Sequence, residues 1–345
     1  MRGRLGRRLA SFALTLGLCS SLAVVNTTLA AGEARAAGRS ACASPDESVR
    51  SAAEVNPAVP FGKWQGTGYG GFLVPENLDV SDDGGVDVLV HFNGAMMTDA
   101  DYRQSKTNAI VMSIAINEIV GSAGYARMFE DPGHMDRVLD SLFATLKKST
   151  KKKLHLRRLG LVSWSAGMGA VGKLLRSPKW SARIDTVVLL DSLHTGYLGK
   201  DGRALVKNEQ HAAMGLGEGA VDKKSLEPFV QFAKEAAAGK KTFVLSASAI
   251  VPPDYASASE TGRALFTLLA GKSVSDANDF DDTKPTRPMT LRFRGDVGNF
   301  HVLGWKGGGK RDHFDQLHLV GDILREHVGH RWFELARKER ADRTS

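Results

Sequence analysis

The sequence predicts an α/β domain built on a doubly wound, mainly parallel β-sheet. Of the 345 residues, 42% are hydrophobic and 24% are charged, an ordinary globular composition with enough apolar residues for a large core. Short apolar runs of the kind that form buried strands alternate with segments whose apolar residues recur at helical spacing. This alternation is typical of parallel sheets that helices cover on both faces.

The N-terminal residues have the organisation of a secretory signal peptide. Several arginines precede the apolar run 9–25, and small residues that suit cleavage follow it. We therefore expect residues 1–36 to be a signal peptide, which predicts a secreted or periplasmic protein. A lipoprotein attached through Cys19 is less favoured because Leu18, directly before it, is not small. An uncleaved membrane anchor is also less favoured, because polar residues interrupt the apolar run.

Charge and cysteine content limit the classes of partner. The formal charge of the chain is +8, and residues 1–36 contribute +4 of it through five arginines and one glutamate. The remaining +4 is too small to predict nucleic-acid binding. Cys42 is the only cysteine after the leader, so no internal disulfide is expected. No later segment is apolar enough to cross a bilayer, so we expect no membrane span once the leader is cleaved.

Residues 37–60, rich in alanine, serine, proline and charge, are predicted to be a flexible linker before the domain 61–345. Gly66–Gly71 predicts a hairpin or turn. The apolar pattern predicts strands at 86–92, 108–116, 154–163, 186–190, 242–245 and 289–293. The same pattern predicts helices at 135–146 and 314–336. The segment 195–240 exceeds a simple crossover and contains a helical run, so we expect an insertion or a lid there.

One stretch, Ser163-Trp164-Ser165-Ala166-Gly167, carries the strongest functional signal. A strand-forming run ends at Ser163, and a helix-forming run follows Gly167. Small residues two before and two after a serine allow a tight strand-to-helix turn that exposes its hydroxyl. The stretch resembles the nucleophile elbow of the α/β-hydrolase superfamily, G-x-S-x-G, with Ser163 in place of the first glycine. A glycine-rich turn with an idle serine is the alternative.

The resemblance implies Ser165 as the nucleophile, followed along the chain by an acid and then a histidine. Asp191 directly follows the apolar run 187–190, which would place it at the carboxyl edge of the sheet, where doubly wound folds carry their sites. Asp254, which lies nearer the superfamily's more usual acid position, and Asp296 are the alternatives for the acid.

His313 is the expected catalytic base. It stands between the glycine-rich loop 307–309 and the closing helix, which resembles the position of the superfamily's catalytic histidine. His301 and His194 are the alternatives, although His301 sits in an apolar run that favours a core histidine.

The resemblance also implies an oxyanion hole formed by the backbone N–H groups of Ala166 and Ala95. Ala95 follows Asn93-Gly94, which stands where the superfamily often has His-Gly. An ordinary Asn-Gly turn is the alternative at that position.

A metal site is not expected. Asp312, His313, Asp315 and His318 form a suggestive group, but His313 and His318 are five residues apart. Side chains at this spacing point roughly 140° apart on a helix, which is poor geometry for two ligands of one metal ion. The acyl transfer that the resemblance implies also requires no cofactor.

The resemblance therefore implies an exported serine hydrolase, a carboxylic ester hydrolase above all, that cleaves an ester-type acyl bond by a Ser-His-Asp mechanism. The expected partner is a small-molecule or lipid-like acyl substrate. Two alternatives remain: a non-catalytic α/β-hydrolase-like binding protein, and a serine peptidase or amidase that acts on cell-wall material.

Overall fold

The computed structural model describes residues 59–116, 121–199, 201–205, 220–253, 255–276 and 289–344. The predicted signal peptide, the predicted linker up to residue 58, both cysteines and Asp254 lie outside the described residues.

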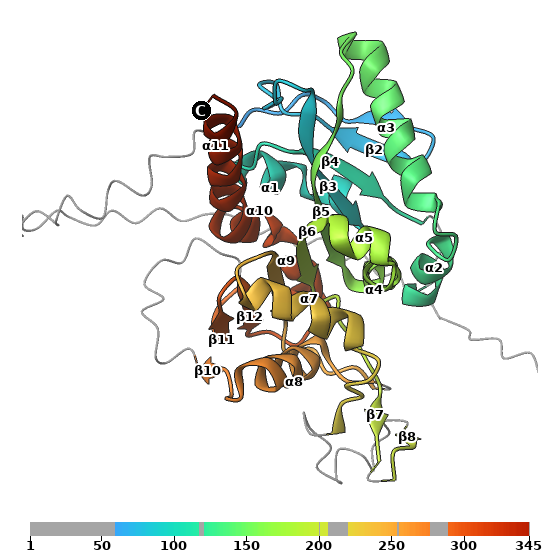
Figure 1. Cartoon of the computed structure of the whole chain (residues 1–345). Helices are drawn as coiled ribbons and strands as arrows, with labels where there is room; N and C mark the ends of the chain where they lie inside the picture. The colour runs from blue at the N-terminus through green and yellow to red at the C-terminus, as the bar shows by residue number, and fades with distance from the viewer. Residues whose placement is uncertain are drawn as a thin grey trace, which may run out of the picture. The chain divides into compact units, whose positions relative to one another are not determined.

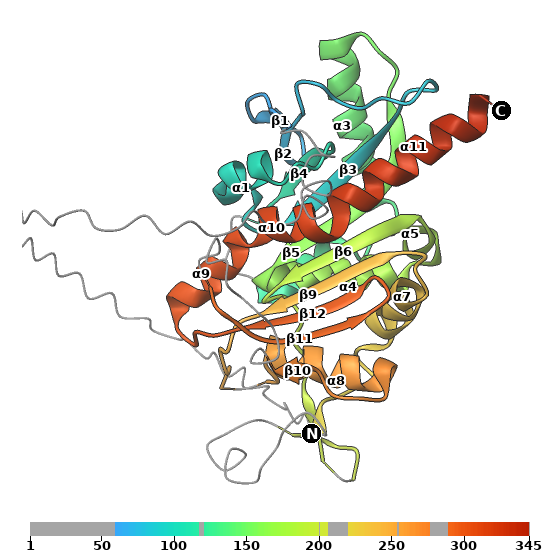
Figure 2. The ribbon, with the colours of Figure 1, turned by 90° about the vertical axis from the view of Figure 1, so that its left-hand side faces the viewer.

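A ten-stranded sheet forms the centre of the domain (Figure 1). Its strands follow the order β1-β2-β4-β3-β5-β6-β9-β12-β11-β10 (Figure 2). Its strands are β1 Gln65–Thr67, β2 Gly70–Leu73, β3 Gly85–Phe92, β4 Ile110–Ile114, β5 His155–Trp164, β6 Ile184–Leu190, β9 Thr242–Ala247, β10 Ser275–Asp276, β11 Leu291–Val297 and β12 Phe300–Trp305. The neighbours from β4 to β12 in this order run parallel, and antiparallel pairs close both edges. The predicted mainly parallel sheet is confirmed, as is the hairpin at Gly66–Gly71.

The central strands are built from apolar residues that suit burial on both faces. Every residue of β3, GVDVLVHF, is buried, and so are the last seven residues of β5. Parallel strands covered by helices on both sides have this continuous apolar character, because neither face meets water. The paired strands β3, β5 and β6 therefore hold in place the loops that follow them at the carboxyl edge of the sheet.

Helices form one layer on each face of the sheet (Figure 2). They are α1 Asp99–Gln104, α2 Gly121–Met128, α3 His134–Thr150, α4 Met168–Arg176, α5 Pro178–Arg183, α7 Glu227–Ala237, α8 Ala258–Ala270, α9 Lys310–His318, α10 Val320–Leu324 and α11 His330–Thr344. Helices α1 and α9 to α11 cover one face, and α2 to α5, α7 and α8 cover the other (Figure 2). None of the described helices has the length and apolar character needed to span a membrane.

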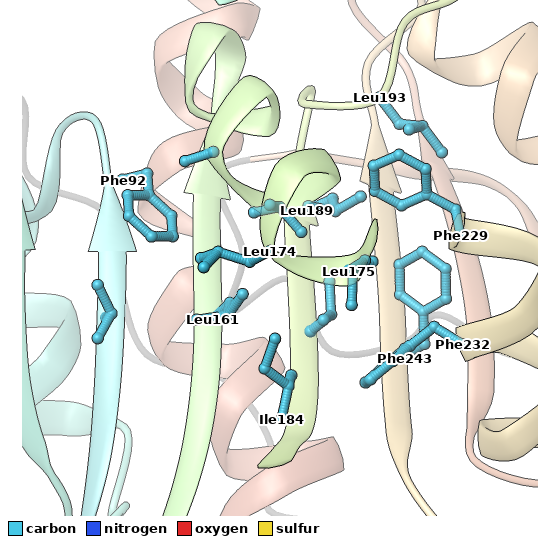
Figure 3. Packing of buried hydrophobic residues seen from close by; sticks show 14 of the residues in the cluster. Phe92, Leu161, Leu174, Leu175, Ile184, Leu189, Leu193, Phe229, Phe232 and Phe243 are labelled. Atoms are coloured by element: carbon cyan, nitrogen blue, oxygen red, sulfur yellow. The ribbon is translucent and has the colours of Figure 1, made fainter. Parts of the chain in front are cut away.

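The larger of the two cores lies between the sheet and the layer that contains α4 and α7. Leu174 and Leu175 of α4 point onto β5 and β6, and Phe229 and Phe232 of α7 pack toward Phe243 of β9 (Figure 3). The rings of Phe232 and Phe243 meet edge to face, with 5.9 Å between their centroids. This packing fixes α4, and with it the turn that begins α4.

The helical run within the predicted insertion 195–240 is α7, a core helix. Most of its apolar side chains are buried in the core. Before it lies a small hairpin of β7 Tyr197–Leu198 and β8 Ala204–Leu205. Residues 206–219 are outside the described part of the chain.

Two elements near the C-terminus differ from the prediction. Strand β12 was not expected, and it joins β9 to the antiparallel edge of the sheet. The predicted single helix 314–336 begins earlier, at Lys310, and is divided into α9, α10, a π-helical turn at Arg325–Gly329 and α11. Strand β12 includes His301 and Gly304, which interrupt its apolar pattern, so distant partner strands rather than local sequence stabilise it.

The sheet order also locates a crevice. Strand β4 lies on one side of β3, and β5, the next strand along the chain, lies on the other. The order of the strands therefore reverses at β3, and the loops that leave β3 and β5 diverge at their carboxyl ends. Ligands of doubly wound sheets bind at such a switch point.

Candidate active site

Ser165 occupies a strained turn between β5 and α4. Strand β5 ends at Trp164, and a short 3-10 helix, Ser165–Gly167, leads into α4. The φ angle of Ser165 is 53°, in the left-handed region that non-glycine residues rarely adopt. A Cβ on Gly167 would lie 2.4 Å from the backbone oxygen of Phe92 on β3, so only glycine fits there. These features are those that the predicted elbow requires.

Ser163, which stands in place of the first glycine of the elbow, is accommodated by a hydrogen bond. It is fully buried, and its hydroxyl pairs with the hydroxyl of Ser192, which follows β6. The Ser192 hydroxyl also donates to the Ser165 carbonyl oxygen over 2.9 Å. Because the buried hydroxyl has a partner, the larger residue avoids the cost of an unsatisfied polar group. The same bonds tie the turn of Ser165 to the end of β6.

Asp191 lies directly after β6 and is 4% exposed. Its φ angle of 44° makes it a second residue with left-handed backbone at this edge of the sheet. Its Oδ1 accepts a hydrogen bond from the Ser248 N–H over 2.6 Å, and its Oδ2 lies 3.1 Å from Nδ1 of His313. An ionised carboxylate only accepts, so Nδ1 of His313 carries the proton of that second bond.

His313 lies in the first turn of α9, and two contacts to Trp164 hold it there. The rings of His313 and Trp164 are in contact, tilted by 32° with 4.8 Å between their centroids. The Trp164 Nε1–H donates to the backbone oxygen of His313 over 2.8 Å. With Nδ1 protonated toward Asp191, a neutral imidazole has its free electron pair on Nε2. A base with this tautomer and orientation can accept a proton from a hydroxyl.

Ser165, Asp191 and His313 line one cavity of about 410 Å³. The sequence predicts that His313 is also hydrogen-bonded to Ser165. Among the described residues this bond is not formed, although the two side chains share the cavity. Catalytic hydrogen bonds are often long without a substrate and tighten when one binds. The three residues belong to the turn after β5, the loop after β6 and the first turn of α9.

The two predicted oxyanion donors begin short helices at the ends of β3 and β5. Ala95 opens the 3-10 helix Ala95–Thr98, and Ala166 lies in the first turn after β5. N–H groups in a first helical turn have no partner within the helix. The Asn93 side chain donates to the Trp164 carbonyl oxygen over 3.2 Å and so links the two loops. Neither alanine belongs to the described lining of the cavity.

Asn93 and Gly94 both have positive φ angles, 73° and 90°. Two consecutive residues of this conformation are typical of a type I′ turn, for which Asn-Gly is favoured. The backbone at Asn93-Gly94 therefore has the φ angles of an Asn-Gly turn. Ala95 directly follows this turn.

Of the alternative acid and base residues, only some line the cavity. Asp296 and His301 bond to each other, with 2.5 Å between Oδ1 and Nδ1, and neither lines the cavity. His194 does line the cavity, close to the pair of Asp191 and His313. Asp254 lies outside the described residues.

The acidic and histidine residues of α9 that were weighed as possible metal ligands bond to different partners. Asp312 accepts from the Gly309 N–H, and His318 bonds to Asp101 on α1. No group of three or more potential metal ligands is present within the described ranges.

Three contributors to the site are not predicted in these roles from the sequence. They are Trp164, which contacts His313, Ser248, which donates to Asp191, and His194, which lines the cavity. Trp164 could have been noticed, since an aromatic residue beside the serine of an elbow faces the same crevice. Nothing in the sequence indicates the backbone contact of Ser248, because it depends on how β9 pairs with β6.

Comparison with known proteins does not assign the chain to a family. No protein-family model matches the chain, and no curated protein matches its sequence. The arrangement of the described residues is therefore the basis for a functional assignment.

Proposed function

We propose that this protein is an exported serine hydrolase of α/β-hydrolase type that cleaves an ester-type acyl bond. Ser165 is the nucleophile, His313 is the general base, and Asp191 orients the histidine and stabilises its cation. The convergence of these three residues on one cavity carries the proposal, since they come from distant parts of the chain. The strained backbone at both Ser165 and Asp191 supports it, because such strain concentrates at active sites.

The chemistry follows from the polar contacts. The Ser165 hydroxyl attacks the substrate carbonyl while Nε2 of His313 takes its proton. The negative oxygen of the tetrahedral intermediate binds the N–H groups of Ala166 and Ala95. His313 then returns the proton to the leaving alcohol, which departs and leaves an acyl-serine. Water, activated in the same way, releases the acid and restores Ser165.

The apolar part of the cavity lining supports a largely apolar ester as the substrate. Besides the proposed catalytic groups, the described lining includes Ile250, Val251, Pro252 and Pro253, which together form an apolar wall. Small-molecule sites have this character, with a mostly apolar surface and a few polar groups that fix orientation. A cavity of about 410 Å³ suits a compact ester.

A fluorophosphonate probe tests the nucleophile, because it reacts only with an activated serine. We expect the wild-type protein to be labelled and Ser165→Ala to be unlabelled. Ser149→Ala, an exposed serine on α3, is the matched control and should be labelled like the wild type. Labelling that persists in Ser165→Ala would refute the assignment. A folded wild-type protein that is never labelled would favour a non-catalytic binding protein.

A further inference from the structure

Among the polar side chains of the cavity that the proposed mechanism does not use, His194 lies near the proposed catalytic pair. His194 lines the cavity together with Ser165 and the apolar residues from Ile250 to Pro253. Its backbone N–H points to the sulfur of Met168, and its ring lies edge-on to Tyr255 with 5.0 Å between centroids. Its Nδ1 is fully buried and has no close hydrogen-bond partner among the described residues, and the nearby Asp191 backbone raises the pKa of the ring by hydrogen bonding. Because Nδ1 has no surface exposed to the cavity, Nε2 is the ring nitrogen that a ligand in the cavity can meet.

The position of His194 is fixed before any ligand binds. The next residue, Thr195, forms an antiparallel bridge with Ala256, whose N–H donates to the Thr195 carbonyl oxygen over 2.9 Å. Ser257 then begins α8 with a capping box to Glu260. The loop after β6 is thus joined to the segment that carries the apolar wall. A polar group held rigidly against such a wall selects ligands by a hydrogen bond.

His194 is neutral at neutral pH. The pKa of its imidazole is lowered to about 4, chiefly because burial disfavours the charged form, although Asp191 opposes the shift. A neutral imidazole has one N–H donor and one acceptor nitrogen. In either tautomer Nε2 can form a hydrogen bond with an uncharged hydroxyl, which both donates and accepts, and a neutral ring does not attract an anion.

We propose that His194 is a specificity residue that binds an uncharged hydroxyl on the carbon chain of the ester, so that the preferred substrates are hydroxylated esters of short chain length. The inference rests on the proposed hydrolase function. The hydroxyl belongs to either the acyl or the alcohol part, and both present the same chemistry to the imidazole.

Matched pairs of esters test this, each pair differing by a hydroxyl in place of a methyl group. The acyl pair is p-nitrophenyl β-hydroxybutyrate and p-nitrophenyl isovalerate. The alcohol pair is the monobutyrate of propanediol and butyl butyrate. The measurement is the ratio of kcat/KM within each pair, which cancels any general loss of activity. We expect the wild-type enzyme to prefer the hydroxylated member of one pair by about tenfold or more.

The variant His194→Leu should lower that ratio about tenfold, since it keeps the volume of the wall but removes both nitrogens. His194→Gln should retain most of the preference, because its amide also donates and accepts. His155→Leu, a histidine at the opposite end of β5, is the control and should leave the ratio unchanged.

Three results would overturn the inference. The first is a wild-type enzyme that hydrolyses both members of both pairs equally well. This result is measured on the wild type alone and so does not depend on whether a variant folds. The second is an unchanged ratio in an active His194→Leu enzyme. The third is a stronger preference for p-nitrophenyl hemisuccinate, which would assign selectivity to the exposed Lys310 at the rim. Failure of the hydrolase function is distinguishable, because then no ester is cleaved and the fluorophosphonate probe does not react.

Discussion

The substitution Asp191→Asn tests the catalytic arrangement most directly. The buried N–H of Ser248 donates to Oδ1 over 2.6 Å, so the amide oxygen of an asparagine must keep that position. The amide NH₂ then faces Nδ1 of His313, where the carboxylate Oδ2 now lies 3.1 Å away. Because this NH₂ only donates, Nδ1 must become the acceptor, and the proton of a neutral imidazole moves to Nε2. A histidine in that tautomer cannot accept the serine proton.

The expected loss in kcat is about ten thousandfold, the scale found when the acid of a Ser-His-Asp triad becomes an amide. It corresponds to about 5 kcal/mol of transition-state stabilisation. The fold should be retained, because asparagine has nearly the shape of aspartate and both hydrogen bonds keep a partner. The thermal midpoint of unfolding should therefore change by only a few degrees.

The assay is steady-state hydrolysis of a p-nitrophenyl ester by the wild-type and variant enzymes. Asp296→Asn is a matched control, because Asp296 also bonds to Nδ1 of a histidine, His301, but outside the cavity. It should keep the wild-type rate. A loss of less than tenfold in Asp191→Asn, with Ser165→Ala inactive, would show that the reasoning about the tautomer is wrong.

Three further outcomes are expected. Gly167→Ala should lower the free energy of unfolding by about 1–3 kcal/mol in urea titrations, because its Cβ would meet the backbone oxygen of Phe92 at 2.4 Å. Trp164→Phe should lower kcat/KM for ester hydrolysis about tenfold, since a ring remains beside His313 but the donor to its carbonyl is lost. Burial lowers the pKa of His91 to about 3, so protonation favours the unfolded chain and stability falls as the pH drops below about 6.5. Between pH 7 and pH 5 the wild-type protein should therefore lose about 2 kcal/mol more than His91→Leu, measured by urea unfolding at each pH.

The sequence by itself determined the elements whose formation depends on near neighbours. Continuous apolar runs predicted β3, β5 and β6, because a strand buried on both faces needs apolar residues at every position. The small residues around Ser165 predicted a tight strand-to-helix turn, since its backbone depends on the local φ angle and the room for Gly167. Asp191 was expected at the carboxyl edge because it directly follows a predicted strand.

Only the tertiary structure decided which side chains meet. Asp191 and His313 are 122 residues apart, and their bond depends on how α9 returns across the sheet. The same is true of the Ser248 contact and of His194, since both arise from the pairing of segments remote in sequence. Local patterns determine secondary structure because its hydrogen bonds join near neighbours or repeat regularly. A site requires convergence, which only the packing of distant elements around a shared core determines.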